Sequence, residues 1–410
     1  MIYGQDQPYR DKWVVNVEAT AQEPVVILGV PVNGMLPVIS GENAVTRTQL
    51  NYWNENRAII KIGASSTPNN NNASHITIEC LDIQSAKPGY VFTDDTGSAN
   101  QSYSNNAAAI TIEQGKHITI KRCDLHDAGN GLFTTSLTSN ILISSNHIYD
   151  NGIYDHYYEH NSYTESHGIV FEYNHYGSLC SGCTGNNLKD RSTGTIIRYN
   201  WIEDGNRQLD LVDTDHDEIR NDSRYHSTFV YGNVLIEGDG EGNSQMIHYG
   251  GDSGDTDYYR KGTLHLYHNT IVSTRSGNTT LVRLSSADES LDARNNIIYN
   301  TAGGAYFAMA GSEGQLTLTN NWLPSGWRNS HSSFNGSITL LDNIESLDPA
   351  FQNLSGKDFH LMENASAIDS GTSLSTSAEP HLILSEYVQH QNNQSRIEDA
   401  VPTMGAFSIE

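Results

Sequence analysis

Apolar and polar residues alternate along most of the chain in short runs that include one asparagine. The clearest run reads Ile141-Leu142-Ile143-Ser144-Ser145-Asn146-His147-Ile148. Further copies are centred on Asn174, Asn200, Asn233, Asn269, Asn296 and Asn321, and an earlier copy has Cys123 in the Asn position. Because side chains of a strand alternate between two faces, this period of two predicts a β-strand in each copy.

The spacing of the repeat indicates the fold class. Successive asparagines of the series lie 28, 26, 33, 36, 27 and 25 residues apart. This length is too short for a strand, a packed helix and their loops, but it suits one turn of a parallel β-solenoid. The alternative, an antiparallel β-sandwich, would not require Asn at one fixed place in each repeat. We therefore predict an all-β parallel β-helix of about ten coils, with terminal caps and loop insertions on one side.

The repeated asparagine has a physical role in such a coil. Asn tolerates the left-handed backbone conformation, so we expect it to occupy a sharp corner. Copies stacked about 4.8 Å apart could then hydrogen-bond to one another as a ladder.

A second strand follows the asparagine run in each coil, and long polar insertions interrupt the connections. The second strands are expected at 129–133, 186–191, 207–211, 244–248 and 279–283. The insertions, rich in Tyr, Asp, Gly and Ser, lie at 86–107, 151–167, 175–187, 213–227 and 250–260. Since functional residues concentrate in loops on a rigid scaffold, we expect the insertions to border the working face.

The ends of the chain are expected to close the solenoid. Residues 1–58 predict an N-terminal cap and first coil, and residues 59–340 the β-helix catalytic domain. Residues 341–410 lose the Asn pattern, which predicts a C-terminal cap of the same domain. Caps prevent edge-to-edge growth of the exposed terminal strands.

Charge and hydropathy narrow the function classes. The formal net charge is −25, from 23 basic and 48 acidic residues, which argues against a nucleic-acid binder. No apolar run of about 18 residues exists, so we expect no membrane span. We expect a monomer that is secreted, extracellular or periplasmic, with a leader removed ahead of Met1. An anionic substrate would require a locally basic wall or a bound cation.

The four cysteines do not predict a dense disulfide framework. Cys180 and Cys183 form a CxxC without the second ligand pair that a zinc site needs. A loop disulfide and two free thiols both remain open for this pair. Cys80 and Cys123 lie in strand-like runs and are expected to be buried thiols.

The repeat and the C-terminal stretch together resemble a known group. The ladder repeat covers roughly residues 59–325, and the chain closes with Leu347-Asp348-Pro349-Ala350-Phe351, Asp358-Phe359-His360-Leu361, Ala367-Ile368-Asp369-Ser370-Gly371 and Met404-Gly405-Ala406-Phe407. These features resemble the secreted bacterial right-handed parallel β-helix proteins of the pectate-lyase-like superfamily. The resemblance implies a right-handed helix and leaves the substrate open.

A sharper local similarity lies in the middle of the chain. The segment Asn187-Leu188-Lys189-Asp190-Arg191-Ser192, with 195–200 and 208–211 after it, is similar to the catalytic coils of family-6 polysaccharide lyases, the alginate lyase and chondroitinase B group. The resemblance implies that Lys189 is the Brønsted base. The family's assisting Arg is absent, because 209–212 reads Leu-Asp-Leu-Val, and Arg191 is the expected stand-in. Thr184 and Gly185 occupy the place of the acidic Ca²⁺ ligand, so Ca²⁺ stays a candidate cation without an identified metal site.

Elimination from a uronate needs a base for the C5 proton, a positive charge for the carboxylate and an acid for the leaving oxygen. Lys189 and Arg191 share a face, because residues i and i+2 of a strand point the same way. Asp210 follows Lys189 by 21 residues, close to one coil, and is expected beside it on the next rung. His248 and Arg283 are expected on later rungs of the same column.

The candidate residues divide into two sets. Catalytic roles are expected for Lys189, Arg191, His160 and Tyr163, with the latter two as alternative base or acid. Substrate-binding roles are expected for Asp210, His248, Arg283, Tyr158, Asn187 and Glu165. A solvated wall of unrelated polar residues is the structural alternative, but lysine is scarce in this acidic chain and here clusters with arginine.

Three functions follow from this pattern. The first is a polysaccharide lyase acting on a uronic-acid-containing glycan of the alginate, glycosaminoglycan or pectate type. The second is a glycoside hydrolase, which needs two carboxylates about 5–9.5 Å apart, drawn from Asp210 with Asp213, Glu165 or Asp190. The third is a non-catalytic carbohydrate-binding solenoid. A Ca²⁺ site would draw on the acidic residues Asp210, Asp213, Asp215 and Asp217.

Overall fold

The structure is a computed structural model that describes residues 1–69, 72–240, 242–397 and 400–409. The chain divides into two compact units, Met1–Thr193 and Gly194–Glu410. Within each unit the strands form parallel sheets in which strands one coil apart are hydrogen-bonded neighbours. Each unit is therefore a stack of right-handed parallel β-helix coils, which confirms the predicted fold class.

Each coil of unit 1 contributes a strand to each of three sheets. The first sheet contains β1 (Ile2–Tyr3), β3 (Val25–Val30), β7 (Ser74–Glu79), β12 (Gly115–Lys121), β15 (Thr138–Ser144) and β18 (His167–Glu172). The second contains β4 (Val38–Ser40), β8 (Asp82–Ala86), β13 (Asp124–Ala128), β16 (His147–Ile148) and β19 (His175–Tyr176). The third contains β2 (Asp11–Val15), β6 (Ala58–Ile62), β11 (Ala108–Ile112), β14 (Asn130–Thr134), β17 (Ser162–Thr164) and β20 (Leu188–Asp190). The third sheet continues beyond β2 with β5 (Ala44–Thr46), β9 (Val91–Thr93) and β10 (Gln101–Ser102), and η1 (Glu55–Arg57) precedes β6.

Unit 2 repeats the three-sheet arrangement. Its first sheet contains β21 (Thr193–Arg198), β24 (Ser227–Tyr231), β27 (Thr263–Tyr267), β30 (Ser290–Arg294), β33 (Gln315–Thr319) and β35 (Ser337–Leu341). The second contains β22 (Trp201–Glu203), β25 (Val234–Glu237), β28 (Thr270–Ser273), β31 (Ile297–Asn300), β34 (Trp322–Pro324) and β36 (Ile344–Ser346). The third contains β23 (Leu209–Leu211), β26 (Gln245–Tyr249), β29 (Thr279–Leu284) and β32 (Phe307–Ala310). The loops hold α1 (Asp217–Arg220), η2 (Ser223–His226) and η3 (Gly304–Tyr306).

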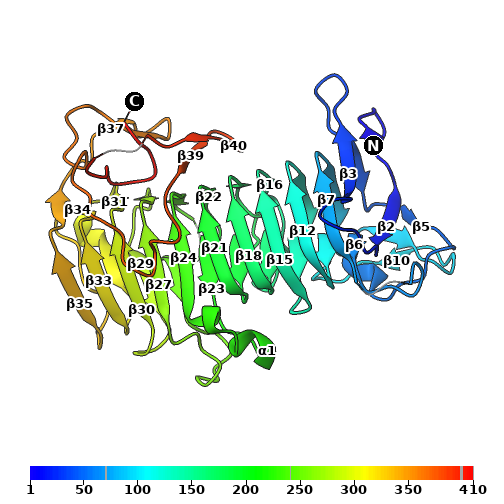
Figure 1. Cartoon of the computed structure of the whole chain (residues 1–410), viewed down its shortest axis with the longest axis horizontal. Coiled ribbons are helices and arrows are strands. Elements are labelled where there is room, and N and C mark those ends of the chain that lie inside the picture. The colour runs from blue at the N-terminus through cyan, green and yellow to red at the C-terminus, as the bar shows by residue number, and fades with distance from the viewer. Residues whose placement is uncertain (70–71, 241, 398–399, 410) are drawn as a thin grey trace. The chain divides into compact units, whose positions relative to one another are not determined.

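The alternating sequence pattern fixes the register of neighbouring coils. In unit 1, Ile118 of β12 pairs with Ile141 of β15, and Ile120 pairs with Ile143. These isoleucines are buried, and the residues between them face outward. Figure 1 shows β12, β15 and β18 lying side by side as successive rungs. A slip of one residue would turn the whole apolar set outward, so burial enforces this register.

The asparagine ladder forms, but the corner geometry differs from the expectation. The left-handed residues are those just before the ladder position, such as Ser145 (φ 56°) and Tyr173 (φ 57°). The following asparagine turns its side chain inward. In unit 1, Asn146 Nδ2 donates to Asn174 Oδ1 at 3.0 Å and to the carbonyl of Ile120 at 2.9 Å. The ladder thus satisfies buried corner groups, while the preceding residue takes the strained backbone conformation.

The ladder runs one coil further than the sequence pattern suggested. Asn321 Nδ2 donates to Asn343 Oδ1 at 3.0 Å, although residues 341–410 were expected to lack the pattern. The coil that contains Asn343 is completed by β35 and β36, which ends at Ser346. The last turn of the β-helix therefore extends past residue 340.

The chain after Ser346 covers a sheet face in unit 2. It contains two antiparallel hairpins, β37 (Phe351–Asn353) with β38 (Asp358–Leu361) and β39 (Ser385–Val388) with β40 (Asn392–Ser395). Its apolar residues join a buried cluster with the outer face of the second sheet, composed of Trp201, Val234, Ile236, Val272, Ile297, Trp322, Phe351, Phe359, Leu361, Ala365, Ala367, Tyr387, Met404, Ala406 and Phe407. The segment thus seals a side of the second sheet and does more than cap its last strand.

The long insertions flank the third sheet. In unit 1 they precede third-sheet strands, as in the segment between β16 and β17, and the segment between β19 and β20. In unit 2 the two longest follow third-sheet strands, between β23 and β24 and between β26 and β27. Within each unit these long loops therefore leave one edge of the third-sheet strands. The third sheet is the face that these loops border.

Two smaller expectations can now be answered. Cys180 and Cys183 form a disulfide, whereas Cys80 and Cys123 are free, with Cys123 buried and Cys80 half-buried. Among the described residues, no helix has the length and apolar character needed to cross a membrane.

Candidate functional site

The outward positions of the third sheet in unit 1 bring cationic and aromatic side chains into one column. Register pairs run from Lys61 to Thr111, then to Phe133, Tyr163 and Lys189. Because paired residues of parallel strands lie about 4.8 Å apart, side chains that are far apart in sequence become neighbours. Tyr163 is therefore the rung neighbour of Lys189.

Tyr163 is the centre of a group of four predicted catalytic side chains. Arg191 Nε donates to the Tyr163 hydroxyl oxygen at 3.0 Å, and the Lys189 ammonium lies 5.9 Å from the centre of the ring. The His160 ring meets the Tyr163 ring edge-on, with centroids 5.4 Å apart. The structure thus brings Lys189, Arg191, His160 and Tyr163 together, as the sequence predicted.

The four side chains differ in burial. Lys189 is 7% exposed and His160 only 2%, whereas Tyr163 and Arg191 are half-buried. His160 Nδ1 accepts the backbone N–H of Asn186 at 2.9 Å. Because Nδ1 already accepts this hydrogen bond, we interpret His160 as a residue that supports the Tyr163 ring. It is not one of the register-paired residues of the column. Tyr163 and Arg191 form the accessible front of the group.

A second cationic and aromatic group lies lower in the same column and was not found from the sequence. Lys61 forms an ion pair with Glu113 at 2.8 Å and lies 4.6 Å from the centre of the Trp53 ring. Arg57 lies over the Phe133 ring at 4.9 Å. Trp53 is 47% exposed, so its ring faces solvent. The sequence signal was the pairing of basic and aromatic residues in 52–61, most of which precede the repeat.

Three predicted binding residues of unit 1 take different positions. Asn187 is fully buried, and its Oδ1 accepts from Asn161 Nδ2 at 2.5 Å, within a second ladder that begins at Asn151. The Asn187 side chain therefore lies in the interior and not on the binding wall, because it is a hydrogen-bond partner for buried polar groups at a corner of the coil. Tyr158 is exposed, and its ring lies 4.1 Å from the Tyr157 ring at an interplanar angle of 35°. Glu165 is half-buried beside the end of β17.

Two of the carboxylates considered for a hydrolase, Asp190 and Asp213, are enclosed. Asp190 is fully buried, and its Oδ1 accepts from the hydroxyls of Thr164 at 2.8 Å and Ser192 at 2.6 Å. Asp213 is also fully buried, and it accepts the backbone N–H of Asp252 at 2.8 Å. Groups held in this way cannot reach a glycosidic oxygen.

The same contacts bear on a cation site. The Asp213 carboxylate also accepts the hydroxyl of Ser253, so its oxygens receive donors from the protein. Asp215 and Asp217 point outward, with side chains 82% and 83% exposed, and Asp217 pairs with Arg220. The acidic residues of this loop therefore do not converge on one point as Ca²⁺ ligands do.

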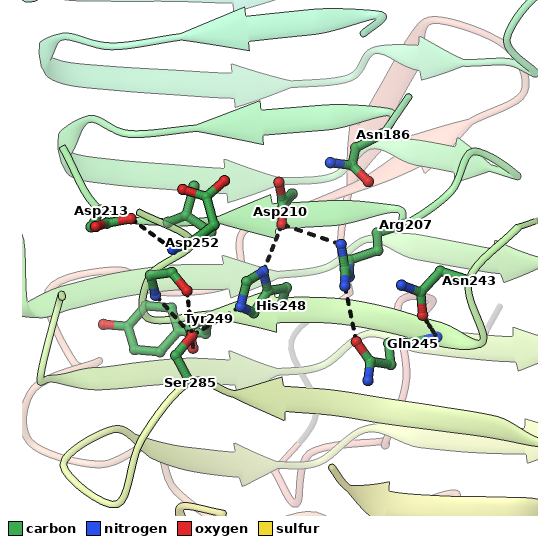
Figure 2. A network of polar contacts seen from close by, with 12 residues as sticks. Asn186, Arg207, Asp210, Asp213, Asn243, Gln245, His248, Tyr249, Asp252 and Ser285 are labelled. Atoms are coloured by element: carbon green, nitrogen blue, oxygen red, sulfur yellow. Dashed lines mark hydrogen bonds and ion pairs between the residues drawn. The ribbon is translucent and has the colours of Figure 1, made fainter. Parts of the chain in front are cut away.

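In unit 2 the third sheet carries a second column, of which Figure 2 shows Asp210 and His248. Asp210 pairs in register with His248, and His248 with Arg283, as the coil length predicted. Asp210 Oδ1 lies 2.8 Å from His248 Nδ1 and 3.8 Å from Arg207 Nη1. Arg207 Nη2 donates to Gln245 Oε1 at 3.0 Å. Arg207 was not singled out in the sequence, although it begins the predicted strand 207–211.

Burial sets the protonation of this column. It lowers the pKa of His248 below its ordinary 6.5, against the opposing effect of the hydrogen bond to Asp210. The positive charges of Arg207 and Arg283 lower it further. Burial likewise lowers the pKa of Arg207, which Asp210 partly offsets. His248 is therefore neutral near pH 7, with its ring held by Asp210.

Similarity to known proteins is found among solved structures. No family model matches the chain, and no curated protein matches it in sequence. Among solved structures, pectate lyase Pel9A aligns over 100% of this chain and 86% of its own chain. The two share 11% sequence identity, and the TM-score is 0.49. The surface protein and adhesin PfbA of Streptococcus pneumoniae covers 76% of this chain and 86% of its own at 9% identity, with a TM-score of 0.42. DFA-IIIase from Arthrobacter chlorophenolicus A6, in complex with DFA-III, covers 85% of this chain and 88% of its own at 10% identity, with a TM-score of 0.41.

Proposed function

We propose that this protein is a secreted polysaccharide lyase that cleaves a uronic-acid-containing glycan by β-elimination. The observation that carries the proposal is the pairing of Tyr163 with Lys189 on adjacent rungs, with Arg191 Nε 3.0 Å from the phenol oxygen. A base, an acid and a fixed positive charge thus meet on one outward wall, and these are the groups that elimination requires.

Each side chain has one role in the reaction. Lys189 Nζ removes the C5 proton, and the electron pair of that C–H bond becomes the C4–C5 double bond. The C4–O4 bond breaks, and the Tyr163 hydroxyl gives its proton to the leaving O4. Arg191 stabilises the uronate carboxylate while it carries enolate charge. Because Arg191 donates to the phenol oxygen, the phenol proton is not used in this contact and can be directed at O4.

The enclosure of Asp190 and Asp213 favours a lyase over a glycoside hydrolase. A hydrolase needs two carboxylates that reach the glycosidic bond. Asp190 and Asp213 are both fully buried and accept hydrogen bonds from the protein. The names of the similar structures include a lyase, a surface adhesin and another enzyme, so they support a carbohydrate-active β-helix without selecting the reaction.

The activity test uses alginate, pectate, hyaluronan and chondroitin as separate substrates. Elimination produces an unsaturated uronate, so absorbance near 232 nm should rise with at least one of them. New reducing ends without this absorbance would identify a hydrolase. No product from any glycan of the panel would contradict an enzyme of this class.

The residue test replaces the base and keeps the fold. Lys189→Ala should lower kcat at least about 100-fold, since general bases contribute roughly 10²–10⁴-fold. Tyr163→Phe, which keeps the ring against His160 and Lys189, should lower kcat by a similar factor. Lys116→Ala is the matched control, because it removes one exposed lysine from β12 in the first sheet. Retained activity in Lys189→Ala, with circular dichroism unchanged, would exclude Lys189 as the base.

A further inference from the structure

Three side chains of unit 2 form a continuous hydrogen-bonded chain that β-elimination does not use. Asp210 Oδ1 lies 2.8 Å from His248 Nδ1, and His248 Nε2 lies 2.9 Å from Ser285 Oγ. Asp210 comes from β23, His248 from β26, and Ser285 follows β29 directly, so each residue belongs to a successive coil. Figure 2 shows the imidazole of His248 between the carboxylate and the hydroxyl.

The carboxylate fixes the tautomer of the imidazole. An ionised carboxylate only accepts hydrogen bonds, so the proton of His248 sits on Nδ1, facing Asp210. Nε2 then carries a lone pair directed at the Ser285 hydroxyl. This order of carboxylate, imidazole and hydroxyl is the arrangement that activates a serine for attack on a carbonyl carbon.

The surroundings of Ser285 hold its oxygen in place. The backbone N–H of Gly251 donates to Ser285 Oγ at 2.8 Å. The hydroxyl proton has three acceptors within reach, namely His248 Nε2, the Gly251 carbonyl at 2.9 Å and the Tyr249 carbonyl at 3.3 Å. Rotation of the Ser285 hydroxyl group alone can direct its proton at His248 Nε2. No backbone rearrangement is therefore needed to reach the active arrangement.

Accessibility and charge show what could approach this serine. Ser285 is half-buried, whereas Asp210 and His248 are each only 2% exposed, so the hydroxyl is the outward end of the chain. Arg283 is exposed and is the register partner of His248. Its positive charge is close enough to affect His248. An anionic group next to a carbonyl would find both a cation and the hydroxyl here.

We propose that Ser285 is a nucleophile that hydrolyses a small ester, such as an O-acetyl group, on an anionic sugar. His248 is its general base, Asp210 is a positioning residue, and Arg283 supports the charge that develops on the carbonyl oxygen. This activity is independent of β-elimination, which is assigned to Lys189 and Tyr163 of unit 1. A glycan that carries such esters would be a substrate for both reactions.

The steps balance with water as the only co-reactant. Ser285 Oγ bonds to the ester carbon, and its proton moves to His248 Nε2. The bond to the sugar oxygen breaks, and His248 returns the proton to that oxygen. Water then attacks the acyl-serine while His248 accepts one of its protons. The acid leaves, and the proton returns to Ser285.

Covalent labelling of the unaltered protein is the primary test. The full chain is incubated with a fluorophosphonate, which phosphonylates activated serines, and the labelled site is located by peptide mass spectrometry. We expect one added phosphonyl group on Ser285 and release of acetate from acetylated alginate. Absence of label on Ser285, in a mixture where a known serine hydrolase is labelled, would overturn the proposal.

Variants distinguish a Ser285 hydroxyl that is activated by His248 from one that is merely exposed. Ser285→Ala should abolish labelling, and His248→Gln, which leaves Ser285 in place, should slow it at least about 100-fold. Ser312→Ala is the control, because Ser312 is an exposed serine of unit 2 outside this chain. Labelling of Ser285 at an unchanged rate in His248→Gln would show an unactivated hydroxyl and refute the proposal. Labelling is read directly, so loss of lyase activity would not affect the conclusion.

Discussion

Single side chains on the outer face of the second sheet in unit 1 titrate unusually. Asp124 of β13 pairs in register with Asp82 of β8, and His126 Nε2 lies 3.0 Å from Asp82 Oδ1. Burial, with the negative charge of Asp82, raises the pKa of Asp124 from 3.8 to about 6. A carboxyl with a raised pKa favours folding at low pH and loses that contribution as pH rises from the unfolded to the folded pKa.

This residue gives a prediction on stability against pH. Asp124→Asn removes the charge that must be buried above pH 6, so the variant should be more stable than the parent at pH 8. The gain should be at most about 3 kcal/mol, from 1.36 kcal/mol for each unit of pKa difference. It should be much smaller near pH 4, because Asp124 is then protonated in the folded protein and only partly ionised in the unfolded chain, whose pKa is 3.8. Urea unfolding at pH 4, 6 and 8 measures the difference.

Asp288→Asn, at an exposed position, provides the comparison for this experiment. Its effect should be small and should not change between pH 4 and pH 8. Equal stabilisation by Asp124→Asn at both pH values would contradict the raised pKa and would point to a packing effect of the amide.

At the scale of elements, asparagine side chains at the corner between the first and second sheets link successive coils. In unit 2, Asn233 Oδ1 accepts the backbone N–H of Asn200 at 2.9 Å, and Asn233 Nδ2 donates to the carbonyl of Ile197 at 2.9 Å. Both partners are buried and far from water. Each asparagine therefore satisfies groups of the neighbouring coil, so the corners are mechanically coupled along the stack.

Removing one ladder residue should show this coupling. Asn233→Ala leaves several buried donors and acceptors without partners, at about 1–3 kcal/mol each. We expect a loss of about 2–5 kcal/mol in the free energy of unfolding, measured with urea and circular dichroism. Asn335→Ala, at an exposed loop position, should change it by less than about 0.5 kcal/mol. A loss below about 1 kcal/mol for Asn233→Ala would show that water replaces the ladder.

The second sheet shows a further difference between elements. Its outward positions in unit 1 are polar, such as Asp82, Asp124 and His147. The outward positions of the second sheet of unit 2 include Trp201, Val234 and Trp322, which the C-terminal segment buries. A strand with an apolar outward face needs another segment packed over it, because large exposed apolar patches are unfavourable in water. The sequence of these strands therefore already marks where the C-terminal segment packs.

At the scale of the whole molecule, charge works against the proposed substrate. The protein carries a formal net charge of −25 and would repel a polyuronate at long range, whereas the third sheet of unit 1 presents Lys189 and Arg191 at short range. Screening lengths fall from about 30 Å at 0.01 M salt to about 10 Å at 0.1 M. Added salt therefore weakens the long-range repulsion between the net charge and the glycan before it weakens the short-range contacts of Lys189 and Arg191.

The prediction is that salt accelerates capture of an anionic glycan. The ratio kcat/KM on the polyuronate substrate should rise severalfold between 10 and 150 mM NaCl, because the encounter is no longer slowed by net charge. The kcat at saturating substrate should change little over the same range. A fall of kcat/KM over this range would show that the basic wall, and not the net charge, controls the encounter. Potassium chloride at the same ionic strength tests for specific effects of sodium.

The amino-acid sequence by itself determined the coils and their register. The two-residue alternation and the 25–36-residue spacing predicted parallel strands, and the structure pairs Tyr163 with Lys189 and Asp210 with His248 accordingly. The physical reason is that the apolar side of each strand must face the interior. Once one residue of a coil is placed, the positions of the others on that strand follow.

Only the tertiary structure decided what lies beyond this periodicity. Ser285 follows the end of a strand, and its place against His248 depends on the turn at Gly251 and not on alternation. Asn187 looked like a surface residue but completes an interior ladder. Side chains at corners and turns are placed by hydrogen bonds to other coils, so their roles depend on contacts between residues far apart in the chain, which no local pattern encodes.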